Sequence, residues 1–247
     1  MTEWSIVVGL GVVGEAIVKN ILAGSDRKVL VVFNGDCPDF LSANSRVKVF
    51  TAVISKDTDW NSFLENVNCI HSMFLVAGPC LPRSNNVNLI GYSAEFIENI
   101  GVINFAFLEL VSAALPLLRN RSYLVGISST LAGRISLDDA TLDYHAAKAA
   151  LNNIMRYLSV RLASTSSVFT VSPALIAKTP DSVLLTSGDL KKSVESSTPM
   201  GVPSTPTQVA DICTELTNGK WDYMTGNEVL LDGGSSLIEP FSIAKKN

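Results

Sequence analysis

Residues 7–18 read Val-Val-Gly-Leu-Gly-Val-Val-Gly-Glu-Ala-Ile-Val, so that an apolar run leads into three closely spaced glycines and then a helix-like segment. Gly9, Gly11 and Gly14 match the pattern Gly-x-Gly-x-x-Gly, whose glycines allow a tight turn, the approach of a pyrophosphate and close packing of helix on strand. Amides at the start of the helix would donate hydrogen bonds to the phosphates. The stretch predicts a strand–turn–helix unit that binds a dinucleotide, with a close-packed structural turn as the alternative.

The remaining chain alternates short apolar runs with longer amphipathic segments. The predicted strands cover 4–8, 29–33, 47–53, 72–77, 123–128, 168–172 and 228–231. The predicted helices cover 14–23, 57–66, 92–119, 143–163 and 206–218. Strands that are apolar along nearly their whole length are typical of a parallel sheet that is buried on both faces. We therefore predict an α/β fold: a Rossmann-like, doubly wound parallel sheet of about seven strands with helices on both faces.

The length of 247 residues suits one domain that spans 1–247. Residues 174–205 are the least regular part of it and are rich in Ser, Thr, Pro and Lys. In an open α/β sheet, a long segment after the carboxyl end of a strand usually lies over the ligand crevice. We interpret this segment as a substrate lid, with an ordinary surface excursion as the alternative.

Composition narrows the possible partners and the compartment. The net charge is −4, the chain has no basic run, and no apolar stretch is long enough to cross a membrane, which argues against nucleic acid or a membrane as the main partner. The first apolar run lacks the basic residues that precede the core of a signal peptide. The four cysteines show no metal-site spacing and no Cys-x-x-Cys pair, so we expect free thiols, no metal site and a cytoplasmic location.

Tyr144 and Lys148 lie four residues apart in the run Asp-Tyr-His-Ala-Ala-Lys, within a predicted helix. At this spacing the two side chains share one face of the helix. An ammonium group beside a phenol favours the phenolate, so we expect Lys148 to lower the pKa of Tyr144 and make it a general acid/base. A solvated helix face is the alternative for an isolated pair. His145 points about 100° away around the helix and is not expected to take part in catalysis.

Several further elements follow in an order and at a spacing that resemble the short-chain dehydrogenase/reductase family. They are Ala77-Gly78 after the fourth predicted strand, the segment 97–101 with Asn99, the strand and serines of 125–129, Ser172-Pro173-Ala174, Thr225-Gly226 and the Leu-Asp-Gly-Gly of 231–234. The resemblance covers nearly the whole chain. It implies an NAD(P)-dependent oxidoreductase that interconverts a carbonyl and a secondary alcohol by hydride transfer.

The resemblance also implies roles for individual residues. Tyr144 would exchange a proton with the substrate oxygen, and Lys148 would lower the pKa of Tyr144 and bind the nicotinamide ribose. A hydroxyl of the Ser-Ser-Thr cluster would bond the substrate oxygen: alignment by the strand end favours Ser129, and alignment by the next glycine gives Thr130. Asn99 would hold a water that links Lys148 to solvent. The implied cofactor-binding residues are Gly9, Gly11, Val13, Gly14, Asn34, Ala77, Gly78, Tyr144, Lys148, Pro173, Ala174 and Ile176.

The cofactor half departs from the family pattern. The glycine turn is one residue shorter than usual, and Val53 stands where the family has an acid that contacts adenine. Asp36 follows the second predicted strand at the distance expected of a residue that bonds a ribose hydroxyl, and no Lys or Arg lies between 29 and 45 to meet a 2′-phosphate. The sequence therefore favours NAD over NADP, with a plain turn residue as the alternative for Asp36.

These departures leave two other functions open. One is a cofactor-binding regulatory or scaffold protein without redox turnover, and the other is an isomerase or dehydratase that uses the same Tyr/Lys pair. In the family, the helices at 92–119 and 143–163 commonly build a homodimer or homotetramer. The apolar side chains of Ile154, Leu158 and Leu162 would either serve such an interface or pack on the sheet.

Overall fold

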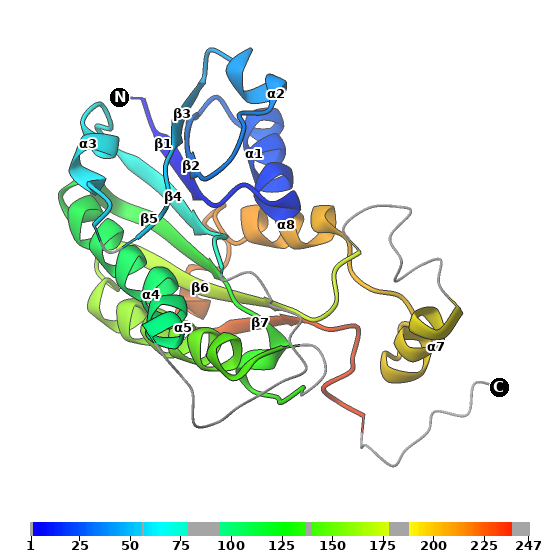
Figure 1. Cartoon of the computed structure of the whole chain (residues 1–247). Coiled ribbons are helices and arrows are strands. Elements are labelled where there is room, and N and C mark those ends of the chain that lie inside the picture. The colour runs from blue at the N-terminus through cyan, green and yellow to red at the C-terminus, as the bar shows by residue number, and fades with distance from the viewer. Residues whose placement is uncertain (1, 56, 79–93, 137–139, 178–187, 239–247) are drawn as a thin grey trace.

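The computed structural model describes residues 2–55, 57–78, 94–136, 140–177 and 188–238 of the chain (Figure 1). Its centre is a seven-stranded sheet in the order β3-β2-β1-β4-β5-β6-β7, and every strand runs parallel to its neighbours. The strands are β1 (Trp4–Val8), β2 (Lys28–Phe33), β3 (Val47–Thr51), β4 (Ile70–Leu75), β5 (Leu118–Ile127), β6 (Ser166–Pro173) and β7 (Glu228–Leu231). The order reverses between β1 and β4, and an open α/β sheet forms its ligand crevice at such a switch point.

Helices cover both faces of the sheet. On one face lie α1 (Val12–Gly24) and α8 (Pro206–Glu215), and on the other lie α3 (Trp60–Leu64), α4 (Ala94–Ala114) and α5 (Leu142–Arg161) (Figure 1). The shorter elements are α2 (Asp39–Ser42), α7 (Gly188–Ser197) and the 3₁₀ turns η1 (Leu115–Leu117), η2 (Thr130–Ala132) and η3 (Asp222–Met224). None of the helices in the described part of the chain is long and apolar enough to span a bilayer.

Two apolar cores lie on the two faces of the sheet, and neighbouring residues of one strand alternate between them. In β1, Ile6 and Val8 belong to the core beneath α4 and α5, whereas Val7 belongs to the core beneath α1 and α8. Every residue of β1 is therefore buried. This burial explains why the strand sequences are apolar throughout, and the predicted fold class and strand number are confirmed.

The structure departs from the predicted element bounds most clearly in β5. This strand begins at Leu118, five residues before the predicted start at Tyr123. Its first part is polar, its pairing with β4 shifts register between Ile70 and Ser72, and Arg121 has a φ of 75°. A strand that pairs irregularly has no continuous apolar pattern, and the prediction relied on such a pattern.

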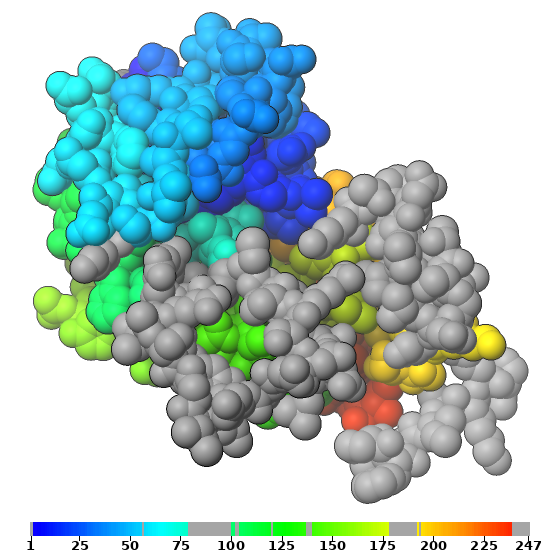
Figure 2. Space-filling model, in the orientation of Figure 1, coloured from blue at the N-terminus to red at the C-terminus, as the bar shows by residue number. Residues whose placement is uncertain are grey.

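The segment predicted to be irregular, 174–205, contains the helix α7. Figure 1 shows α7 standing apart from the sheet, beyond the carboxyl ends of the strands, and in Figure 2 its yellow atoms lie at the lower right of the molecule. The chain that follows α7 is tied to the sheet by the turn after β7: the amide of Met200 donates to the carbonyl of Gly233 at 3.2 Å. A Cβ on Gly233 would lie 2.5 Å from Thr198, so this glycine allows the close approach.

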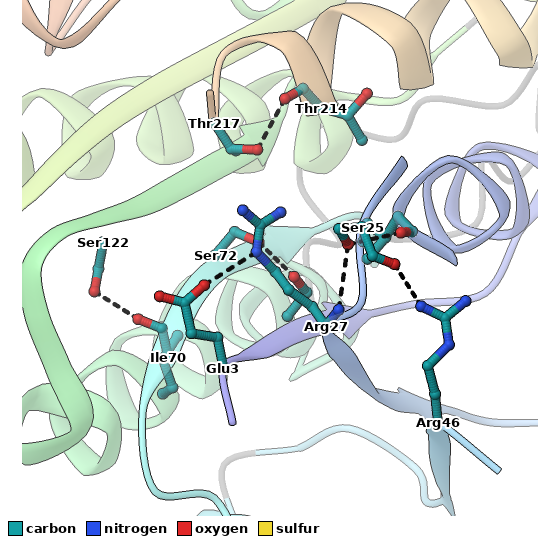
Figure 3. Close-up of polar contacts among 11 residues, drawn as sticks. Glu3, Ser25, Arg27, Arg46, Ile70, Ser72, Ser122, Thr214 and Thr217 are labelled. Carbon is teal, nitrogen blue, oxygen red and sulfur yellow. Dashed lines mark hydrogen bonds and ion pairs between the residues drawn. The ribbon is translucent and has the colours of Figure 1, made fainter. Parts of the chain in front are cut away.

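Polar side chains join the strands at the opposite, amino edge of the sheet (Figure 3). The hydroxyls of Ser5 and Ser72 lie 2.8 Å apart, and the Ser122 hydroxyl donates to the carbonyl of Ile70 at 2.6 Å. Arg27 pairs with Glu3 at 3.3 Å just before β2 begins. The two serine contacts satisfy buried polar groups, and the Glu3–Arg27 pair lies at the surface.

Candidate active site

The carboxyl end of β5 and the beginning of α5 bring the central predicted residues together. Tyr144 lies in the first turn of α5, and Ser129 follows the end of β5 and caps η2. The hydroxyl of Ser129 hydrogen-bonds the phenol of Tyr144. Two oxygens able to exchange and donate protons thus meet at the carboxyl edge of the sheet, where the ligand crevice of this architecture lies.

Lys148 lies one turn further along α5 and is 4% exposed. Its Nζ donates a hydrogen bond to the carbonyl oxygen of Ile127 at 2.8 Å and lies 5.8 Å from the centre of the Tyr144 ring. A Cβ on Gly78 would lie only 3.3 Å from the same Nζ. The ammonium therefore sits between the ends of β4 and β5, and burial lowers its pKa to about 8.

The pKa of Tyr144 moves in the direction opposite to the prediction. Burial raises the pKa of the phenol, and the hydrogen bond from Ser129 only partly offsets that rise. The Lys148 ammonium donates its hydrogen bond to the carbonyl oxygen of Ile127, and its Nζ lies 5.8 Å from the centre of the Tyr144 ring. Tyr144 is consequently a neutral phenol, and so a proton donor, in the neutral pH range.

The structure separates Ser129 from Thr130. Ser129 accepts a hydrogen bond from the amide of Leu131 at 3.2 Å, which leaves its own proton free to be donated. Thr130 instead lines a cavity of about 440 Å³ behind η2. The other residues around this cavity are Ala132, Gly133, Arg134, Ala149, Asn152, Arg156, Glu228, Leu230 and Ser236. Of the two hydroxyls, only that of Ser129 bonds Tyr144 in the described part of the chain.

An asparagine that the sequence analysis did not select faces α5. Asn104 of α4 is buried, and its Nδ2 lies 3.5 Å from the carbonyl oxygen of Ala147, next to Lys148. Its Oδ1 is buried without a hydrogen-bond partner among the described residues. The predicted residue, Asn99, also lies in α4, but its side chain falls outside the described part. Asn104 stands five residues after Asn99, between the apolar residues Ile103 and Phe105, and its sequence context alone does not distinguish it.

The glycine turn has the local geometry that its sequence predicts. Gly9 has a φ of 97°, and a Cβ there would lie 2.4 Å from the amide nitrogen of Ala77. A Cβ on Gly14 would lie 2.2 Å from the carbonyl oxygen of Gly9. Gly11, at the beginning of α1, has nothing within 4 Å of such a Cβ. Gly9 and Gly14 therefore permit close packing, while Gly11 leaves backbone open to a bound group.

The other predicted cofactor-binding residues lie along the same edge. Val13 is buried in the first turn of α1, and Asn34 is exposed directly after β2, as is Asp36. Pro173 ends β6, and the amide of Ala174 donates to the carbonyl of Leu231 at 3.0 Å. Ala77 and Gly78 follow β4, and Ile176 forms a bridge with Ser204.

The low pKa of Lys148 makes stability depend on pH. An unfolded lysine titrates near 10.5, so between about 8 and 10.5 the unfolded chain binds more protons than the folded chain. The free energy of unfolding should therefore rise with pH in that window, by at most about 1.4 kcal/mol per pH unit. Urea unfolding should show this rise in the wild type and lose it in Lys148→Met. Lys19→Met, at an exposed site, is the control, and an unchanged slope in Lys148→Met would contradict the burial argument.

The chain is similar in sequence to known reductases. A family model described as enoyl-(acyl carrier protein) reductase matches residues 45–236, more than half of the chain. A tropinone reductase homologue of Arabidopsis thaliana is 28% identical over 228 residues, 91% of this chain and 81% of the relative. Another from the same plant is 30% identical over 149 residues, 59% of this chain, and the match spans about half (55%) of that relative.

The fold has a close counterpart among solved structures. The structure of 3-oxoacyl-[acyl-carrier protein] reductase from Brucella melitensis in complex with NAD superposes with a TM-score of 0.80 at 21% identity, over 97% of this chain and 99% of that chain. At this identity the likeness shows the fold alone, and the family model supplies the relationship. The chain therefore belongs to the short-chain dehydrogenase/reductase family of oxidoreductases.

Proposed function

We propose that the protein is an NAD(P)-dependent oxidoreductase that interconverts a carbonyl and a secondary alcohol, with Tyr144 as the general acid/base. The observation that carries this proposal is the hydrogen-bonded pair of Ser129 and Tyr144, one helical turn from the buried ammonium of Lys148. These groups can hold a substrate oxygen and exchange a proton with it. The nicotinamide, when bound, supplies or accepts the hydride.

In the reductive direction, Ser129 and Tyr144 both donate to the carbonyl oxygen. The Leu131 amide occupies one lone pair of Ser129, and the serine proton, which bonds the phenol in the structure, would turn to a bound carbonyl oxygen. Tyr144 then transfers its proton as negative charge develops on the oxygen. Because burial raises the pKa of Tyr144, the phenol is in the donating form at neutral pH, and this favours reduction there.

The glycine turn and the strand ends fit a dinucleotide. The open backbone at Gly11 would lie against the pyrophosphate, and the ammonium of Lys148, beside Gly78, would bond ribose hydroxyls. Asn34 and Asp36 would lie near the adenosine ribose. Residues 29–45 carry the carboxylate of Asp36 and no Lys or Arg, which supports NAD rather than NADP.

Asn104 is our preferred residue for the water that would link Lys148 to solvent, because its Oδ1 is a buried acceptor with no partner among the described residues. Asn104→Ala should lower kcat by about 10-fold or more and shift the pH at which kcat falls, since proton transfer through Lys148 would slow. Asn99→Ala is the matched comparison on the same helix. Steady-state rates across the neutral and alkaline range measure both variants. A larger loss in Asn99→Ala would restore the assignment made from the sequence.

We propose further that residues 1–247 form one domain and that the chain assembles into a homodimer or homotetramer. Leu158 is buried in the core on this face of the sheet, and the partly buried Ile154 and Leu162 pack against that core. The outward faces of α4 and α5 carry exposed apolar side chains instead: Phe105, Tyr157 and Val160. The free thiols of Cys37, Cys69 and Cys213 fit a reducing compartment such as the cytoplasm.

A substrate screen tests the main proposal. Titration with NADH and NADPH would first measure binding, and turnover would then be followed on a panel that includes tropinone, a 3-oxoacyl thioester and simple cyclic ketones. Nicotinamide oxidation that requires a ketone supports the proposal. Tight cofactor binding without turnover on any ketone would favour a regulatory or scaffold protein. Product formation with unchanged nicotinamide absorbance would favour an isomerase or dehydratase.

A further inference from the structure

His145 is 6% exposed, and both of its ring nitrogens face backbone carbonyl oxygens. Nδ1 lies 2.7 Å from the carbonyl oxygen of Leu131, and Nε2 lies 3.2 Å from that of Ser136. A carbonyl oxygen only accepts hydrogen bonds, so each ring nitrogen must carry a proton to bond its partner. One side chain of α5 thus holds the chain at both ends of the segment 131–136.

The Leu131 contact closes a ring of interactions around the acid/base pair. The amide of Leu131 donates to Oγ of Ser129 at 3.2 Å, and the Ser129 hydroxyl bonds the phenol of Tyr144. The carbonyl of Leu131 in turn accepts from Nδ1 of His145, the residue that follows Tyr144 on α5. A displacement of Leu131 would therefore move the serine oxygen relative to the phenol.

We propose that His145 is a positioning residue, which sets Ser129 against Tyr144 through Leu131 and fastens the following loop to α5 through Ser136. The proposal rests on the acid/base function proposed for Tyr144. His145 does not touch the phenol's reacting oxygen or the Ser129 hydroxyl in these contacts, so its effect on the reaction is geometric. Groups that act together in a transition state lose rate steeply when they are misplaced.

The number of protons on the ring decides how many of the two bonds form. Neutral imidazole has one N–H group and the imidazolium has two. The neutral form protonated at Nδ1 keeps the shorter bond, to Leu131, and the imidazolium adds the bond to Ser136. The charged residues close to His145 along α5 are Asp143 and Lys148. Arg134 lies on the segment that His145 bonds, and its side chain donates to the carbonyl of Ser235 at 3.1 Å.

Asn and Gln separate the two contacts, because the amide nitrogen of Asn can take the place of Nδ1 and that of Gln the place of Nε2. His145→Asn should keep the Leu131 bond and hold kcat within about 3-fold of wild type, whereas His145→Gln should lower kcat by about 10-fold or more. His145→Ala removes both bonds and should match or exceed the loss in His145→Gln. Rates are measured with the best ketone of the panel above, and urea unfolding checks that each variant is folded.

A spectroscopic measurement tests the geometry independently of activity. The chain contains two histidines, so nitrogen-15 labelling of histidine yields two sets of ring signals, and His71→Gln assigns them. We expect Nδ1 of His145 to carry a proton throughout the neutral range. An unprotonated Nδ1, or equal losses of kcat in His145→Asn and His145→Gln, would overturn the proposal. If the wild type turns over no ketone, the proposed function fails while the Nδ1 signal still decides the Leu131 contact.

Discussion

Replacement of Tyr144 with Phe is expected to lower kcat by about 1,000-fold or more while leaving the Kd for the nicotinamide cofactor within about 3-fold of wild type. The substitution removes one oxygen atom, the atom that bonds Ser129 and would exchange a proton with the substrate. The ring itself, which packs 5.8 Å from the Lys148 ammonium, is kept. Steady-state rates and a fluorescence titration with NADH measure the two quantities separately.

Tyr157→Phe is the matched control, because Tyr157 lies on the same helix, loses the same atom and is 66% exposed. It should have wild-type kcat and wild-type Kd. Retained turnover in Tyr144→Phe would remove Tyr144 from the reaction. If cofactor binding and turnover were lost together, the phenol would be part of the cofactor site and not a separable acid.

The glycine turn should respond very differently to alanine at two neighbouring positions. In Gly14→Ala the new Cβ would lie 2.2 Å from the carbonyl oxygen of Gly9, so the turn or α1 must move. We expect the free energy of unfolding to fall by about 3 kcal/mol, as in other overpacked sites. In Gly11→Ala the Cβ meets nothing within 4 Å, and stability should change by no more than about 0.5 kcal/mol.

Gly11→Ala, which should leave stability nearly unchanged, is the variant expected to weaken dinucleotide binding. Gly11→Ala should raise the Kd for NADH by about 10-fold or more, because the side chain would occupy the space through which a pyrophosphate approaches the backbone. Urea unfolding without cofactor, followed by NADH titration of the folded variants, measures both effects. Gly24→Ala, where a Cβ also meets nothing within 4 Å, controls for alanine in an open position away from the turn. Unchanged NADH affinity in Gly11→Ala would show that the turn is structural only.

The fold was predictable because the signal that specifies it is local and repeated. The first and last strands match their predicted bounds, since each is a compact apolar run between turn residues. The beginning of β5 was missed because its register shift and the left-handed Arg121 break the apolar pattern. The helix α7 was missed because only two of its residues, Leu190 and Val194, are apolar, so its polar composition resembles that of a loop.

The sequence predicts which candidate side chains share a helix, but it does not predict the burial around them. The spacing of Tyr144 and Lys148 on one helix follows from the sequence, but the burial that raises the tyrosine pKa does not. His145 was not expected to take part in catalysis because its side chain lies about 100° around the helix from that of Tyr144. Its contacts are to backbone carbonyls of another segment, and no residue identity encodes those. Asn104 is recognisable only once α4 and α5 are packed together.

The hydrogen-bonded serines at the amino edge, Ser5 with Ser72 and Ser122 with Ile70, have a practical consequence for protein engineering. Ser122 precedes Ser129 by seven residues along an extended strand, and energetic effects of well-separated sites usually add. Stabilising substitutions can be selected at the amino edge and substitutions that change substrate scope at the carboxyl edge. The selected substitutions from the two libraries can then be combined in one protein. Substitutions at the two edges of the parallel sheet should therefore affect stability and substrate scope independently.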